Sequence, residues 1–168
     1  AKIEPFLDAF DASYAIVGND GGTFYVLTNR NAPRFRLVAI QRSMPAEDAW
    51  RTLVPEASGT SVLQGVTMVN ERFVTLWMTD ARHEVRVHGL DGQPGAEVAL
   101  PALGAVSAVT GRRAHKEMFY SFGSFLYPTS VYRYDFAGAK SEVFKKPALD
   151  FDPSGYETGQ VFYNSKDG

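Results

Sequence analysis

Short apolar and aromatic runs alternate with turn residues along the whole chain. No stretch keeps the i, i+3, i+4, i+7 spacing that would bury one face of a helix over three turns. Several runs instead alternate apolar and polar side chains with a period of two, which is typical of half-buried strands. The pattern therefore predicts an all-β chain, with one helical turn near 45–48.

Three segments repeat the same order of parts: a strand of small residues, a strong aromatic strand, an alternating third strand and a weaker fourth strand. The predicted first strands are 14–17, 64–69 and 105–110, the second 24–29, 73–78 and 118–122, the third 35–40, 84–90 and 130–136, and the fourth 50–55, 96–101 and 142–147. The second strands recur at roughly 45 to 50 residues, the period of four-stranded propeller blades. Each fourth strand stops at a proline, which suits a strand end because proline lacks the N–H of a central ladder.

This order predicts a partial β-propeller of about three four-stranded antiparallel blades. We divide the chain into 1–10 as the outer strand of a preceding blade, blades at 11–58, 59–103 and 104–150, and a final segment at 151–168. The final segment belongs to no fourth copy of the repeat. A closed β-sandwich or barrel is the alternative with a similar strand count.

Composition excludes several function classes. The net charge is −2, and the 17 basic and 19 acidic residues are scattered, so we expect no nucleic-acid partner. No apolar run approaches the ~20 residues of a membrane span, so we expect a soluble chain without a membrane partner. Cysteine is absent, which excludes disulfides and thiolate metal sites but does not fix the compartment. Cytoplasmic and periplasmic locations both stay open.

No motif for catalysis, cofactor or metal is recognisable. Ser124 lies in Gly-Ser-Phe after an aromatic strand, without the small neighbours and following helix of a hydrolase nucleophile, so we interpret it as a loop serine. His83, His88 and His115 lack a metal-binding pattern or a paired nucleophile, and we expect them at the surface. The glycine pair at 21–22 opens no helix and is a hairpin feature rather than a phosphate cradle.

Two further groups favour structural roles. Carboxylates gather at strand ends and turns, where they can accept from backbone N–H groups; they are Asp8, Asp11, Asp80, Asp91, Asp135, Asp150 and Asp152. An aromatic series resembles a base-stacking platform, but its basic neighbours lie in the preceding loop, so we expect core and inter-blade packing. Its members are Phe119, Tyr120, Phe122, Phe125 and Tyr127.

Three strings resemble the prolyl oligopeptidase family of serine peptidases. They are Thr-Asn-Arg-Asn-Ala-Pro at 28–33, Met-Phe-Tyr-Ser-Phe-Gly-Ser-Phe at 118–125, and Tyr-Glu-Thr-Gly-Gln-Val-Phe-Tyr-Asn-Ser-Lys-Asp-Gly at 156–168. The last is similar to the family segment that leaves the propeller and re-enters the α/β-hydrolase domain. The strings occur in the family's order and spacing, so the resemblance covers essentially the whole chain and about a quarter of a complete enzyme.

In that family a seven-bladed propeller covers a hydrolase domain that cleaves short peptides after proline. The resemblance implies that this chain supplies the last three blades of that filter, with a role in gating substrate access and supporting the catalytic domain. It also implies no catalytic residue, cofactor or metal here, and no activity from this chain alone. The implied partners are the hydrolase domain and the remaining blades, with short proline-containing peptides bound only by the complete enzyme.

The loops 30–34, 79–83 and 124–130 join second to third strands and should emerge at one end of the propeller. We expect one set of loop ends to contact the catalytic domain, with charged residues such as Asp80 or Arg82 holding the domains closed. The alternative function is an independent propeller-like protein-binding module, but three blades are too few to close a ring. An open arc leaves the end blades uncovered, which predicts self-association.

Overall fold

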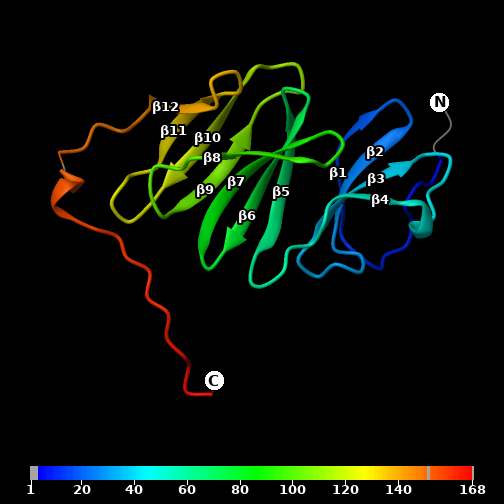
Figure 1. Ribbon diagram of the computed structural model, residues 1–168, viewed down its shortest axis with the longest axis horizontal. Helices are drawn as coiled ribbons and strands as arrows, with labels where there is room; N and C mark the ends of the chain where they lie inside the picture. The colour runs from blue at the N-terminus through cyan, green and yellow to red at the C-terminus, as the bar shows by residue number, and fades with distance from the viewer. Residues whose placement is uncertain (1–3, 151, 168) are drawn as a thin grey trace.

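The computed structural model describes residues 4–150 and 152–167, and these form three four-stranded antiparallel sheets (Figure 1). The first sheet contains β1 (Tyr14–Asp20), β2 (Thr23–Thr28), β3 (Arg36–Gln41) and β4 (Arg51–Val54). The second contains β5 (Val62–Val69), β6 (Arg72–Thr79), β7 (Arg82–Gly89) and β8 (Pro94–Val98). The third contains β9 (Ala105–Thr110), β10 (Glu117–Gly123), β11 (Ser130–Asp135) and β12 (Lys140–Lys145). Hydrogen-bonded neighbours are consecutive in the chain in every sheet, which is the meander of a propeller blade.

The predicted fold class is confirmed, because each predicted strand coincides with an observed one. The predicted helical turn is also present, as a 3₁₀ turn at Glu47–Ala49, and a second one lies at Pro153–Gly155. Strand ends differ by a few residues: β1 continues past a bulge at Ile16/Gly18 as far as Asp20. Within 4–150 and 152–167, no helix has the length and apolar character that crossing a membrane requires.

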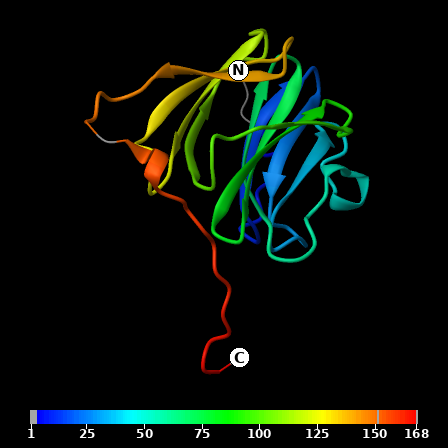
Figure 2. The same ribbon diagram turned by 60° about the vertical axis from the view of Figure 1, so that its left-hand side comes forward.

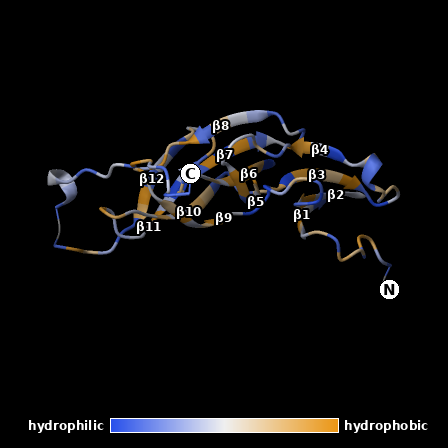
Figure 3. Ribbon diagram, turned by 90° about the horizontal axis from the view of Figure 1, so that it is seen from below, coloured by the Kyte–Doolittle hydropathy of each residue, from blue (hydrophilic) through white to orange (hydrophobic). Residues whose placement is uncertain are grey.

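The three blades pack side by side through apolar seams (Figure 2). One buried cluster joins the first two blades, with Tyr25 and Leu37 on one side and Phe73 and Trp77 on the other. A second joins the second and third blades, where buried valines of β6 and β7 meet the aromatic side chains of β10 and β11. Seen from below, the sheets form an arc, with β1, β5 and β9 on one side of it and β4 and β8 on the other (Figure 3). The first strand of each blade is therefore the inner one.

Both ends of the chain lie outside the sheets. Residues 4–13 contain no strand; instead Phe6 packs 4.8 Å from the Phe24 ring, next to the buried core of the first blade. The expected outer strand at 1–10 lies partly outside the described residues. As the outer strand of a preceding blade, it would have to pair with the third strand of that blade. Residues 156–167 are also free of strand. Both assignments stay predictions.

Candidate functional site

One end of the arc gathers the connections that the sequence singled out. In an antiparallel four-stranded blade, the loop between second and third strands lies at the same end as the exit of the fourth strand. The loops after β2, β6 and β10 therefore share one end with the segment that follows β12. We call this the loop end, and the end formed by the turns after β1, β5 and β9 the inner-hairpin end.

The loop of the first blade is held by charges that satisfy each other. The Arg30 guanidinium lies 2.5 Å from the Asp11 carboxylate and 2.9 Å from that of Glu47. Glu47 also accepts a hydrogen bond from the Asn31 amide at 2.6 Å. Hydrogen bonds from Arg30 and Asn31 lower the pKa of Glu47 because they favour the ionised form. This network fixes the loop and leaves it little capacity for a ligand.

The loop of the second blade is a tight turn at Asp80 and Ala81, whose φ angles are +47° and +61°. This left-handed pair matches the twist of the flanking strands in a two-residue hairpin. The Thr60 hydroxyl donates to the Asp80 carboxylate at 2.7 Å, and the Gln160 side-chain amide donates to the Asp80 carbonyl oxygen. The turn is thus tied to both the connection between the first two blades and the segment after β12.

Arg82 follows this turn and is weakly paired. Its guanidinium lies 3.7 Å from the Glu84 carboxylate, which Arg86 holds more closely at 2.5 Å. Arg86 also lies over the Trp77 ring at 5.0 Å. Because Glu84 is already engaged by Arg86, Arg82 remains a partly exposed cation at the loop end.

The loop of the third blade is built around Ser124. Its hydroxyl oxygen accepts from the backbone N–H groups of Leu126 and Tyr127, at 3.2 and 3.1 Å, and its own N–H donates to the Tyr127 carbonyl at 2.9 Å. These bonds make a defined turn, and they leave the Phe125 side chain 98% exposed at its tip. The interpretation of Ser124 as a loop serine agrees with these bonds; the absence of a nucleophile stays a prediction.

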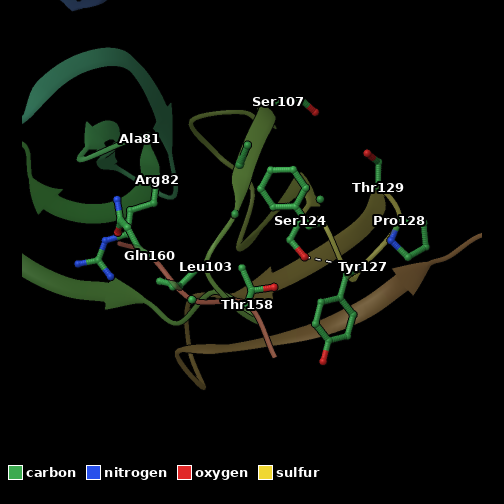
Figure 4. Close-up of a pocket in the computed structure, with 15 residues that line it drawn as sticks. Ala81, Arg82, Leu103, Ser107, Ser124, Tyr127, Pro128, Thr129, Thr158 and Gln160 are labelled. Carbon is green, nitrogen blue, oxygen red and sulfur yellow. Dashed lines mark hydrogen bonds between the residues drawn. The ribbon is translucent and has the colours of Figure 1, made fainter. Parts of the chain in front are cut away.

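A pocket of about 700 Å³ opens between the loops of the second and third blades (Figure 4). Apolar side chains line much of it, including Leu103, Phe125, Tyr127 and Pro128. Arg82 also lines the pocket, together with Thr158 and Gln160 of the segment after β12. The loop end therefore combines an apolar hollow, an exposed aromatic ring and a cation.

His83 joins the second blade to the third beside this pocket. The backbone N–H of Val106 donates to His83 Nδ1 at 2.8 Å, so the ring proton is on Nε2, which donates to Gln64 Oε1 at 2.8 Å. The His83 backbone N–H donates to the Gly104 carbonyl at 3.0 Å. Burial lowers the pKa of His83, because it disfavours the charged imidazolium.

Two expectations about burial were wrong, one for a histidine and one for an aromatic residue. His115 is exposed as expected, but His88 is only 8% exposed, and burial lowers its pKa. The reason is that β7 is a central strand of its sheet, and neighbouring blades pack on both faces of that sheet, so period-two alternation does not separate buried from exposed positions. In the aromatic series, Tyr120 and Phe122 are buried as expected, whereas Phe125 is not. Across the described residues, no group of three or more His, Cys, Asp or Glu side chains could hold a metal ion.

The inner-first meander of four strands, repeated three times around an arc, defines this chain as part of a β-propeller. Residues 1–147 match the family model described as prolyl oligopeptidase, N-terminal beta-propeller domain. The chain therefore belongs to the prolyl oligopeptidase family.

Individual relatives agree with this assignment. The chain is 30% identical over 164 residues to the prolyl endopeptidase of Elizabethkingia miricola, covering 98% of this chain and 23% of that protein. A structure from a study of two prolyl endopeptidases and their inter-domain dynamics superposes with a TM-score of 0.86 at 35% identity, covering 97% of this chain and 24% of that one. Prolyl oligopeptidase B from Galerina marginata gives 0.85 at 27% identity, covering 97% and 24%. The chain thus spans about a quarter of the length of these relatives.

Proposed function

We propose that this chain is a non-catalytic part of the propeller of a serine peptidase that cleaves short peptides after proline. Its role is to gate substrate access and to support the catalytic hydrolase domain. The loop end faces that domain, and the complete enzyme supplies the nucleophile, its base and the proline specificity. By itself, the chain is therefore expected not to cleave peptides.

The observation that carries the proposal is the course of the segment after β12. It leaves the third blade at the loop end and lines the pocket with Thr158 and Gln160 (Figure 4). The Gln160 side-chain amide donates a hydrogen bond to the Asp80 carbonyl oxygen. Beyond it Val161, Phe162 and Tyr163 are all exposed, 72% or more. Such a run of apolar side chains in an extended segment suits a strand that pairs with another domain.

The chemistry of the loop end supports a domain contact. An exposed aromatic ring on a rigid loop and a partly free arginine are the residue types that carry binding energy at protein interfaces. Phe125 and Arg82, which both line the pocket, fill these roles. We assign them to the surface that holds the hydrolase domain closed over its substrate, together with the Asp80 turn.

Alanine substitutions in a complete enzyme carrying this segment test the assignment. R82A and F125A should each weaken domain closure and raise KM for a short proline-containing peptide by about tenfold, the size of an ordinary interface hot spot. R112A is the matched control, because Arg112 is also exposed but lies at the inner-hairpin end. The proposal is wrong if R82A and F125A leave both turnover and domain association at the level of R112A.

The inactivity of the segment needs its own assay. The 168-residue chain should not cleave a proline-containing peptide under conditions where the complete enzyme does. Cleavage that copurifies with the chain would overturn the non-catalytic assignment.

A further inference from the structure

Arg113 connects all three blades at the end of the arc opposite the pocket. It lies in the loop between β9 and β10 of the third blade. Its Nε donates to both carboxylate oxygens of Glu71, at 2.9 and 2.7 Å, and Nη2 lies 2.7 Å from one of them. Its Nη1 donates to the Asn19 carbonyl oxygen at 3.0 Å, and Nη2 lies 3.7 Å from the Asp20 carboxylate. Glu71 belongs to the second blade, and Asn19 and Asp20 to the first.

Arg113 and its partners lie in or beside the turns that join the first and second strands of each blade. Asp20 ends β1, Glu71 lies between β5 and β6, and Arg113 lies between β9 and β10. Since β1, β5 and β9 lie on the inner side of the arc, the three turns form its inner rim (Figure 3). In a closed ring this rim borders the central channel, at the end away from the segment after β12.

The backbone is shaped to bring the turns together. Asn70 and Glu71 both have φ of +52°, a left-handed pair that projects the Glu71 side chain from a tight hairpin. The Glu71 backbone N–H donates to the Arg113 carbonyl oxygen at 3.0 Å. A side chain at Gly111 would place its Cβ 2.7 Å from a methyl group of Val69, so glycine is what lets the third blade approach the second here. The guanidinium therefore meets partners that are already in place.

The contacts of the Arg113 guanidinium differ from the apolar seams between the blades because they are exposed to solvent. The side chains of Arg113, Glu71 and Asp20 are 35%, 58% and 61% exposed, so water and salt reach them. Contacts of this kind are weakened by salt, whereas buried apolar contacts are not. The hydrogen bonds that Arg113 donates to Glu71 raise the pKa of Arg113, which keeps the guanidinium charged. These contacts are therefore sensitive to ionic strength.

We infer that Arg113 is a three-blade clasp that holds the inner rim together and so limits the size of peptide that passes along the channel. The clasp is a property of this chain. Its effect on peptide size rests on the gating function proposed above, and the two parts have separate tests.

The clasp is tested by a distance measurement in the chain as it is. Because there is no cysteine, spin labels at G22C and A114C report only the separation of the first and third blades at the rim. A Cβ at Gly22 meets nothing within 4 Å, so the label fits. R113M should lengthen and broaden the distance distribution, high salt should do the same to the unsubstituted chain, and R113K, which keeps the charge but loses the planar fork, should fall between.

R133M is the matched control. Arg133 pairs with Glu117 and Glu142 at similar exposure, but all three lie in the third blade. R133M should leave the distance distribution unchanged. An R113M distribution that matches R133M, or one that is insensitive to salt, would overturn the clasp.

The effect on peptide size is tested in a complete enzyme with two proline-containing peptides, one short and one close to the longest that is cleaved. R113M should raise kcat/KM for the long peptide by about twofold to fivefold, the range that a partly exposed Arg–carboxylate contact supports, and leave the short peptide unchanged. If R113M widens the rim but both peptides respond equally, the clasp stands and its role in size selection is wrong. The R82A and F125A experiments at the loop end are independent of either result.

Discussion

The contact between Tyr25 and Phe73 crosses the seam between the first two blades, and removing it tests whether the blades stabilise each other. The rings lie 4.9 Å apart at 77°, an edge-to-face pair, and Phe73 has no exposed surface. Replacing a buried aromatic ring by leucine should lower the free energy of unfolding by about 1–2 kcal/mol, less than the 3–5 kcal/mol of a change to alanine. F73L and Y25L should each fall in this range.

The informative quantity is the coupling between the two substitutions. Edge-to-face pairs contribute about 0.5–1.5 kcal/mol beyond their buried area, so the Y25L/F73L double variant should lose that much less than the sum of the single ones. Urea unfolding followed by tryptophan fluorescence is a direct assay, because Trp77 belongs to the same buried cluster. Phe119 and Phe144 provide a control pair at 4.9 Å and 70° within one blade.

Removing the control contact should lower the free energy of unfolding much less. Phe144 is 61% exposed, so F144L should change the free energy of unfolding by less than about 0.5 kcal/mol, the usual limit for surface positions. Zero coupling between Y25L and F73L, or an F73L cost as small as that of F144L, would refute the packed seam.

Three more outcomes follow from individual contacts. Burial holds the pKa of His83 in the folded chain below the 6.5 of the unfolded chain, so its contribution to stability is complete above pH 6.5 and is lost as the pH falls toward the folded value. In H83N the side-chain oxygen can still accept from the Val106 N–H, but the side chain does not titrate. H83N should therefore show a shallower loss of melting temperature between pH 7.5 and 5. F144E replaces an exposed aromatic residue of β12, the outer strand of the third blade, by a charged one, and it should reduce self-association in light scattering. An unchanged oligomer distribution would mean that the chain does not associate through this strand. G92A should cost about 1–3 kcal/mol in thermal unfolding, because Gly92 has φ +91° and a Cβ there would lie 2.3 Å from the Leu53 carbonyl oxygen; a neutral result would contradict the close approach of the first and second blades at this turn.

The strand pattern was predictable because it is local. Runs such as Arg72–Thr79 combine β-branched and aromatic residues, and their spacing at the length of one blade identifies the repeat. Contacts between blades were not predictable in this way. His88 follows the alternation of an exposed position, yet it is only 8% exposed. Phe125 continues an aromatic run, yet the Ser124 turn rotates it into solvent.

The candidate site was predicted only in part. The three loops at one end, with Asp80 and Arg82 on the second, follow from the strand order alone. The pocket needs the segment after β12 to return across them, and no local pattern shows that course. The Arg113 clasp depends on residues 94 positions apart in the sequence, and only their arrangement in space brings Arg113 to Asn19.

Amide hydrogen exchange tests the central claim most directly. The rates in the 168-residue chain are compared with those in a complete enzyme that carries it. We expect added protection in the complete enzyme at the Asp80 turn, the Phe125 loop and 156–163, with little change at the inner-hairpin turns around Asp20 and Glu71. Protection at those inner turns instead, with the loop end exchanging equally in both proteins, would contradict the proposal that the loop end faces the catalytic domain.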